Sequence, residues 1–197
     1  MLTALTPASF ENVQVNAGVF VLGVDPAKHE SLEAFKTALS QAVKDSKTCL
    51  GATRGGGSFA VTKETRTIEA DGRRYGFKGD RVVDSMDAVL STTLIEIIPE
   101  NLEHALAAAD IEDKSWCKAI MPRTEIKDED YIDVITWVGD TNKGYIAITL
   151  YNALNTADFN YGFTDKGEGT LPLELHAHQG GVNDYDKPPF AIYVMEE

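Results

Sequence analysis

Strand-like segments make up most of this chain, and its two helix-like segments do not alternate with them. Residues 131–138 and 145–151 are rich in β-branched and aromatic residues, and a polar, Gly-bounded turn separates them, which predicts a hairpin. In residues 171–177, Leu and Ala alternate with Pro, Glu and His, which is typical of a strand with one buried face. The sequence therefore predicts a mainly β fold, an antiparallel sandwich or barrel, and not a doubly wound sheet.

Two further strand signals lie in the first half of the chain. Residues 17–24 form a nearly apolar run that ends at a turn, which predicts a buried strand. The dipeptide Asp71-Gly72 predicts a tight turn between strands at 58–70 and 73–83. We therefore expect a hairpin or loop at about 70–82.

Helical periodicity appears twice. In residues 30–47 the apolar side chains fall on one face, with acidic residues near the start and lysines near the end, which predicts an amphipathic helix flanking the sheet. Pro99 fits the first position of a second, short helix at about 99–110.

The chain is expected to form a single domain, residues 1–197, because no linker, internal repeat or low-complexity segment divides it. Residues 1–16 are mixed and polar, with isolated apolar anchors at Phe10 and Val13. This pattern predicts a terminal arm, which becomes ordered only where something holds it.

The compartment is indicated by what the sequence lacks. Cys49 and Cys117 lie far apart and have no C-x-x-C spacing, so we expect free thiols in a reducing cytosol. The N-terminus has no basic segment followed by an apolar one, and the run at 17–24 is too short to span a bilayer. We expect synthesis and folding in a cytosol, with no membrane partner.

The formal net charge is −13, from 31 acidic and 18 basic residues. This charge argues against non-specific binding of DNA, because affinity for the phosphate backbone comes mainly from clustered Lys and Arg. It suits either a surface past which DNA slides or simple solubility. Within this acidic chain, Arg73, Arg74, Lys78 and Arg81 form a local basic patch. The patch is either a solvated hairpin tip or a surface that pairs with an acidic face of a neighbouring copy.

Polar residues occupy both faces of the strand predicted around 62–69, and the stretch 82–93 is similarly mixed. Neither face is a proper core face, so such strands need a partner or a water-filled channel on one side. An exposed edge ribbon is the alternative.

The search for chemistry yields weak candidates. His176 and His178 could present two imidazoles to a metal, an arrangement typical of cupins, or could belong to a polar surface. Ser58 lies in a near match to the nucleophile elbow, which lacks its final glycine. Residues 139–144 lack the Lys of a phosphate-binding loop. We expect neither an enzyme nor a cofactor.

Several segments together resemble the tail tube (major tail) protein of long-tailed bacteriophages. The resemblance spans most of the chain as a pattern of strand, turn and helix cues. The segments that carry the resemblance are the Gly-rich segment 51–57, the runs 58–61, 67–72, 75–79 and 94–97, the helix-like segment 99–106, and the C-terminal stretches 171–178 and 188–192.

This resemblance implies a β-sandwich or barrel with one flanking helix, and a structural virion protein. Such subunits close into hexameric rings that stack into a hollow tube, through which DNA is ejected without specific binding. The implied partners are further copies of the chain and the tape measure, tail terminator and tail tip proteins. The implied location is the phage tail, assembled in the bacterial host cytoplasm.

On this reading the strands of 58–97 lie at or near the lumen. The lumen candidates are Glu64, Glu69, Asp84 and Asp87, whereas Lys63 and Arg66 would add unwanted positive charge there. The candidates for contacts between subunits or rings are Phe10, Val13, Arg54, Arg73, Arg74, Lys78 and Arg81. The alternatives are a tube subunit of a contractile tail or tailocin, a cupin-like metalloprotein using His176 and His178, and a carbohydrate-binding sandwich.

Overall fold

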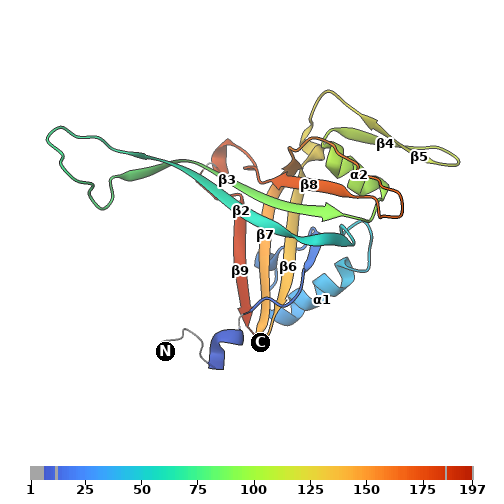
Figure 1. Ribbon diagram of the computed structural model, residues 1–197, viewed down its shortest axis with the longest axis horizontal. Coiled ribbons are helices and arrows are strands. Elements are labelled where there is room, and N and C mark those ends of the chain that lie inside the picture. Colours follow the sequence, from blue (N-terminus) through green and yellow to red (C-terminus); the bar gives the residue numbers. More distant parts are fainter. Residues whose placement is uncertain (1–6, 12, 185, 197) are drawn as a thin grey trace.

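The computed structural model describes residues 7–11, 13–184 and 186–196, which form a mainly β fold built from antiparallel strands (Figure 1). Nine strands and two α-helices lie in this part of the chain, with four short 3-10 turns: Pro7–Phe10, Pro26–Lys28, Asp128–Asp130 and Val182–Asp184. The predicted fold class, a β-rich antiparallel fold with one flanking helix and a second short one, is confirmed.

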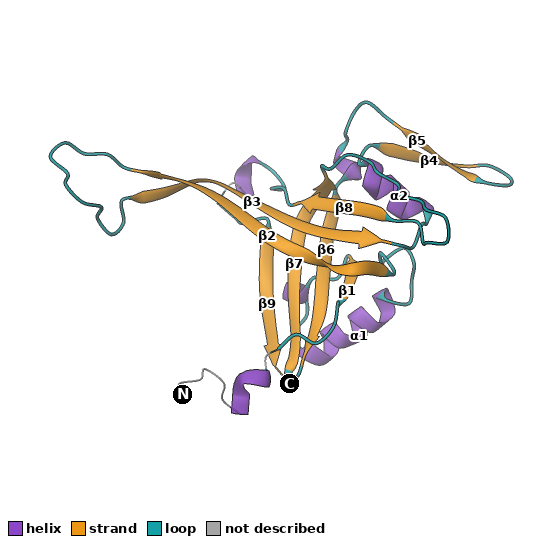
Figure 2. Cartoon of the chain, viewed as in Figure 1, coloured by secondary structure: helices purple, strands orange, loops and turns teal. Residues whose placement is uncertain are grey.

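Two sheets form the body. The first has the strand order β1 (Val19–Leu22), β6 (Ile132–Thr141), β7 (Gly144–Asn155), β9 (Phe190–Glu196), and the second has the order β8 (Leu171–His176), β3 (Arg81–Leu94), β2 (Thr53–Thr67). The end of β7 joins them, because Leu154 pairs with His176 and Asn155 with Leu175. Figure 2 shows β2, β3 and β8 running across β6, β7 and β9, so the body is two crossed layers.

The main core lies between these two sheets. The alternation predicted for residues 171–177 is confirmed, since Leu171, Leu173 and Leu175 are fully buried. They meet buried side chains of the first sheet and of β3, which include Phe20, Ile135, Leu150, Leu90 and Leu94. Burial of this apolar surface is the main stabilising contribution to the fold.

The other face of the first sheet is covered by α1 (Leu32–Ala42). The helix begins after Ser31, whose Oγ accepts a hydrogen bond from the Ala34 amide at 3.2 Å. It is shorter than the predicted 30–47, because the chain turns away after Ala42. Phe35 packs with Val21, Val138 and Ala147 in a second core cluster.

The second helix, α2 (Pro99–Leu106), begins at Pro99 as predicted but ends earlier than residue 110. Ala107 has a φ of 63° and breaks the helix without the glycine that usually signals such an end. Ala109 belongs instead to β4 (Ala109–Asp113), which pairs with β5 (Lys118–Pro122) in a small separate sheet that was not predicted. In the described part of the chain, no helix combines the length and the apolar content needed to cross a membrane.

The hairpin predicted around Asp71-Gly72 is wrong in its boundaries. β2 and β3 pair from Thr53–Leu94 out to Thr67–Arg81, so the strands stop at a broad loop, residues 68–80. The predicted turn at Asp71-Gly72 forms within this loop, where the Arg73 amide donates to the Ala70 carbonyl at 3.3 Å. By contrast, β6 and β7 form the predicted hairpin, with its turn at Asn142-Lys143. β1 lies inside the predicted strand 17–24.

Candidate functional site

The outer half of the β2–β3 hairpin projects from the body as a two-stranded ribbon (Figure 1). We use "the ribbon" for residues 61–67 and 81–88, and "the tip" for residues 68–80. β8 pairs with β3 only over residues 89–94, so the ribbon extends beyond its reach. β2 has β3 as its single strand neighbour among the described residues. The ribbon therefore presents unpaired backbone groups along its length.

The two faces of the ribbon are set by its register. Thr62 pairs with Asp87 and Glu64 with Ser85, so these side chains share the face that points away from the body. The Ser85 hydroxyl donates to the Glu64 carboxylate at 3.0 Å. Glu64 and Asp87, two of the four lumen candidates, thus lie on one face.

The other two lumen candidates lie elsewhere. Asp84 lies at a register shift and forms an ion pair with Arg66, Oδ1 to Nε at 2.8 Å. Glu69 is an exposed residue of the tip. Lys63 pairs with Met86 on the face opposite Glu64. The two cations that conflicted with a lumen-facing strand are therefore either paired or turned to the other side.

An ion pair organises the tip. The guanidinium of Arg73 contacts the Asp80 carboxylate and donates hydrogen bonds to the carbonyls of Ile68 at 2.8 Å and Tyr75 at 3.0 Å. Asp80 also accepts a hydrogen bond from the Phe77 amide at 2.8 Å. Arg73, a candidate contact residue, is thus occupied within its own loop.

The groups that the tip leaves exposed are aromatic and cationic. Tyr75 is 82% exposed and Phe77 68% exposed. Arg74, Lys78 and Arg81 are exposed and make no ion pair with any described residue. Of the predicted basic patch, these three are available to a partner.

The Gly-rich segment 51–57 lies at the base of the hairpin, far along the strand from the tip. Arg54 forms an exposed ion pair with Glu168 at 3.2 Å, so it does not join the basic patch. Gly57 lies against the body, because a Cβ there would come within 2.6 Å of the Ser91 carbonyl oxygen and 2.9 Å of the Phe20 ring.

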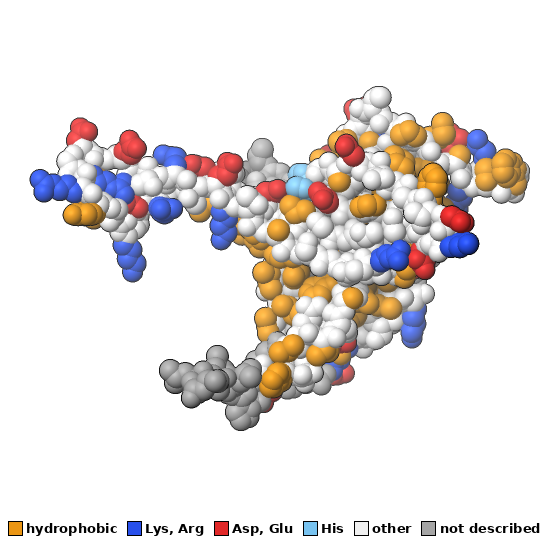
Figure 3. All heavy atoms as spheres, viewed as in Figure 1, with side chains coloured by type: hydrophobic (Ala, Val, Ile, Leu, Met, Phe, Trp, Pro, Cys, Tyr) orange, Lys and Arg blue, Asp and Glu red, His pale blue; other side chains and the backbone are white. Residues whose placement is uncertain are grey.

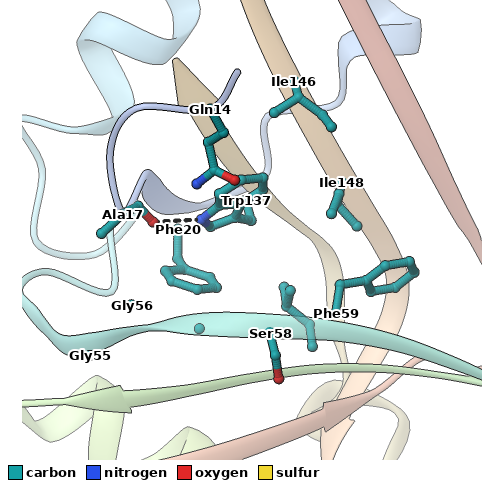
Figure 4. A pocket seen from close by; sticks show the side chains of 12 residues that line it. Gln14, Ala17, Phe20, Gly55, Gly56, Ser58, Phe59, Trp137, Ile146 and Ile148 are labelled. Carbon is teal, nitrogen blue, oxygen red and sulfur yellow. Dashed lines mark hydrogen bonds between the residues drawn. The ribbon is translucent and has the colours of Figure 1, made fainter. Parts of the chain in front are cut away.

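A cleft of about 490 Å³ opens between the base of β2 and the first sheet (Figure 4). Its margin is formed by Gln14 of the arm, Ala17 and the backbone of 55–57. Its walls are mostly apolar side chains: Phe20, Phe59, Leu90, Trp137, Ile146 and Ile148. The Trp137 indole is fixed by a hydrogen bond to the Ala17 carbonyl at 2.9 Å.

An apolar strip continues from this cleft onto the open part of the first sheet. We call it "the shelf": Ile146 and Ile148 of β7 pair with Val194 and Ile192 of β9 and share their face. Ile192 is 53% exposed and Val194 70% exposed. Figure 3 shows hydrophobic side chains gathered in the hollow below the ribbon. Contiguous exposed apolar surface is typical of sites for interaction with another molecule.

The described part of the arm lies along the chain's own β6. The Val15 amide donates to the Asp140 carbonyl at 3.1 Å, and Asn142 donates to the Phe10 carbonyl at 2.6 Å. The side chains of Phe10 and Val13 remain exposed, as contact candidates should. The rest of the predicted arm, residues 1–6 and 12, lies outside the described residues.

His176 and His178 do not converge on one site. The Nδ1 of His176 contacts Asp87, whereas the Nδ1 of His178 lies 3.1 Å from the Asn152 carbonyl oxygen, and its ring packs edge-on against Tyr131. β8 ends at His176, so the strand alternation that would align the pair stops between them. In the part of the chain that the structure describes, no three His, Cys, Asp or Glu side chains group as a metal site requires.

The buried polar groups play a structural part. Burial raises the pKa of the Tyr151 hydroxyl, which hydrogen-bonds to Asp25 and Tyr193, each at 3.3 Å. Asp25 in turn caps the 3-10 turn at Pro26–Lys28. Ser58 lies within β2, in a strand and not at a strand-to-helix turn.

No protein-family model matches this chain, and no curated protein matches it at a significant level. Its function is therefore argued from its own geometry. The cleft and the shelf were missed by sequence reasoning because their residues come from strands that are distant in sequence, β1, β2, β3, β6, β7 and β9. The exposed pair Tyr75 and Phe77 could have been found, since two aromatic residues flank a glycine in a polar loop.

Proposed function

We propose that this protein is a structural subunit of a phage tail tube. Copies of it would form hexameric rings that stack into a hollow tube, through which DNA passes into the host. The observation that carries the proposal is the open margin of the second sheet, where β2 has one strand neighbour among the described residues. A free edge of fifteen residues is a template for association unless another chain completes it.

A second open margin lies on the first sheet. β9 pairs with β7 and with no other described strand, and it borders the shelf. Two different margins on one molecule allow head-to-tail contacts, in which each copy uses one surface on its first neighbour and another on its second. Such contacts form a ring when the rotation between copies closes.

The outward face of the second sheet suits a bore that carries DNA. Glu64, Asp87 and Glu174 share this face, because Asp87 pairs with Thr62 and Glu174 with Ser91. Carboxylates that line a channel repel phosphates and leave DNA unbound. The net charge of −13 adds to this repulsion.

The proposal includes the partners and location that such a subunit has. Tape measure, terminator and tip proteins would contact the bore and the ends of the tube, and the tube would assemble in the bacterial cytoplasm and remain in the virion. A contractile-tail subunit has the same architecture and is the nearest alternative. The cupin-like reading is weakened by the divergence of His176 and His178.

Electron microscopy of the concentrated protein in negative stain tests the proposal. Rings or hollow rods are expected. A protein that stays monomeric at the highest attainable concentration, with no ring in the micrographs, would contradict it.

A charge-reversal variant tests the role of the basic patch. Changing Arg74, Lys78 and Arg81 to Glu is expected to leave a folded protein whose rings no longer stack. Arg73 is kept, because it holds the tip together. The matched control changes Lys28, Lys44 and Lys47 to Glu, which alters the net charge equally at exposed positions near α1. Normal stacking by the patch variant would show that the patch plays no part.

A further inference from the structure

We propose that the tip of one copy docks into the apolar cleft of a second copy, with Tyr75 and Phe77 placed among Phe59, Trp137 and Ile148. This inference rests on the proposed function and names the surface that receives the ribbon. It joins the exposed aromatic pair of the tip and the apolar cleft into one contact between copies.

The tip cannot bury its aromatic side chains against the body of its own molecule. The ribbon carries it away from the body (Figure 1). The contacts of Arg73 with Asp80, Ile68 and Tyr75 fix the loop, so that both aromatic side chains stay exposed. Two aromatic side chains held in water cost free energy that burial against a partner would recover.

The cleft has the size and lining that aromatic side chains need. Its volume of about 490 Å³ falls within the range of pockets that hold small organic molecules, roughly 300–1,000 Å³. The side chains of Phe20, Phe59 and Ile148 point into it (Figure 4). The shelf extends the apolar surface outward from the cleft, so a loop larger than two rings finds further contact area.

Charge favours the same pairing. Residues 66–81, which are the tip with Arg66, Thr67 and Arg81 of the ribbon, contain five basic and three acidic residues, a net +2, which leaves −15 on the rest of the chain. This end of the hairpin is thus attracted to the body of another copy, while two bodies repel each other. Complementarity of this kind directs orientation and speeds encounter.

The geometry of this contact suits stacking. Tip and cleft are different surfaces on each copy, so the contact is heterologous and every bound copy still offers a free tip or a free cleft. A contact that does not close on itself can continue from ring to ring. Aromatic residues seated in an apolar pocket are the residues that typically dominate binding energy at interfaces.

Photo-crosslinking tests the placement directly. Phe77 is replaced by a photoreactive phenylalanine, and the concentrated protein is irradiated. A crosslinked dimer is expected, with the crosslink mapped by mass spectrometry to 55–59 or 137–148 of the second copy. The same probe at Trp116, which is exposed on the β4–β5 turn, is the control. Crosslinks from position 77 to any other region would overturn the proposal.

A mixing experiment tests the direction of the contact. The tip variant carries Tyr75→Ser and Phe77→Ser, and the cleft variant carries Ile148→Lys. Each alone should need at least about tenfold more protein to stack. Mixed in equal amounts, they should form pairs, because one supplies an intact tip and the other an intact cleft. Unchanged stacking of both variants, or no pairs in the mixture, would refute the docking.

Folding and function are separated by two controls. Thermal melting checks both variants, and Ile146→Lys, at a half-buried position that also lines the cleft, replaces Ile148→Lys if the latter does not fold. Wild-type rods without a crosslink from position 77 to the cleft would defeat the docking alone. Crosslinked dimers without rings or rods would defeat the tail tube proposal alone.

Discussion

The Nδ1 of His176 lies 3.0 Å from the carboxylate of Asp87, at the point where β3 leaves β8 and continues into the ribbon. His176 is the last residue of β8 and pairs with Val89, the first residue of β3 that pairs with β8. Its ring contacts Asp87, which lies two residues before this paired part of β3. The contact therefore connects the end of the ribbon nearest the body to β8.

His176→Ala should loosen the ribbon without unfolding the protein. Both partners are partly exposed, so the free energy of unfolding should change by less than about 1 kcal/mol. Hydrogen exchange of the amides in 84–88 should become faster. Glu174→Ala, on the same face of β8, is the control and should leave this exchange unchanged. Equal exchange in both variants would show that the contact does not restrain the ribbon.

Asn101→Ala should destabilise the fold through lost hydrogen bonds. The buried Asn101 side chain donates to the carbonyls of Leu50 at 3.0 Å and Glu96 at 2.9 Å. Removing it leaves both acceptors without this partner, at a cost of about 1–3 kcal/mol in urea unfolding. Asn160→Ala, at an exposed position, should change stability by less than about 0.5 kcal/mol. Similar losses in the two variants would contradict this account.

Buried and exposed apolar residues of the first sheet should separate stability from assembly. Leu150→Ala should cost about 2–5 kcal/mol of unfolding free energy, because Leu150 is fully buried between the sheets. Ile192→Ala should cost far less but weaken assembly, because Ile192 lies on the shelf. Denaturation and light scattering measure the two effects. Normal assembly by Ile192→Ala would remove the shelf from the interface.

Gly57→Ala should disturb the base of the ribbon. The new Cβ would come within 2.6 Å of the Ser91 carbonyl oxygen, so β2 would have to move away from the body. We expect a lower melting temperature and a more open cleft, detected as a shift in Trp137 fluorescence. Gly181→Ala is the control, since open space surrounds that position. A wild-type melting temperature for Gly57→Ala would contradict the close packing.

His104 should make the protein less stable in mild acid. Burial lowers the pKa of its imidazole, although Glu100 partly opposes the shift. The unfolded chain, with a His pKa of about 6.5, then binds the proton more tightly than the folded state. Stability is therefore complete above about pH 6.5 and falls as the pH drops below it. His104→Gln should show a shallower loss in urea titrations between about pH 7 and 5.5, and parallel losses would refute the assignment.

Local patterns predicted much of this fold. The alternation of Leu171, Leu173 and Leu175 marked a half-buried strand, and Pro99 marked a helix start, because both signals depend on neighbouring residues alone. The end of α2 was misplaced, because Ala107 adopts its positive φ without the glycine that signals such a stop.

Features that depend on distant residues were not predictable in this way. Asp71-Gly72 does form a turn, closed by the Arg73 amide and the Ala70 carbonyl at 3.3 Å, but it lies within a broad loop that the contact of Arg73 with Asp80 supports. The cleft requires Phe59 of β2 and Trp137 of β6 to line the same space, and no local sequence pattern predicts that arrangement. The register shift near Asp84, which decides where that carboxylate points, is likewise a property of strand pairing.

The pairing of Arg73 with Asp80 gives the tip its form before any neighbour arrives. A loop that is already ordered loses little conformational freedom on contact, so more of the interaction energy is kept as affinity. Growth of an assembly built this way would be limited by how often copies collide in the right orientation, and not by a slow folding step on arrival.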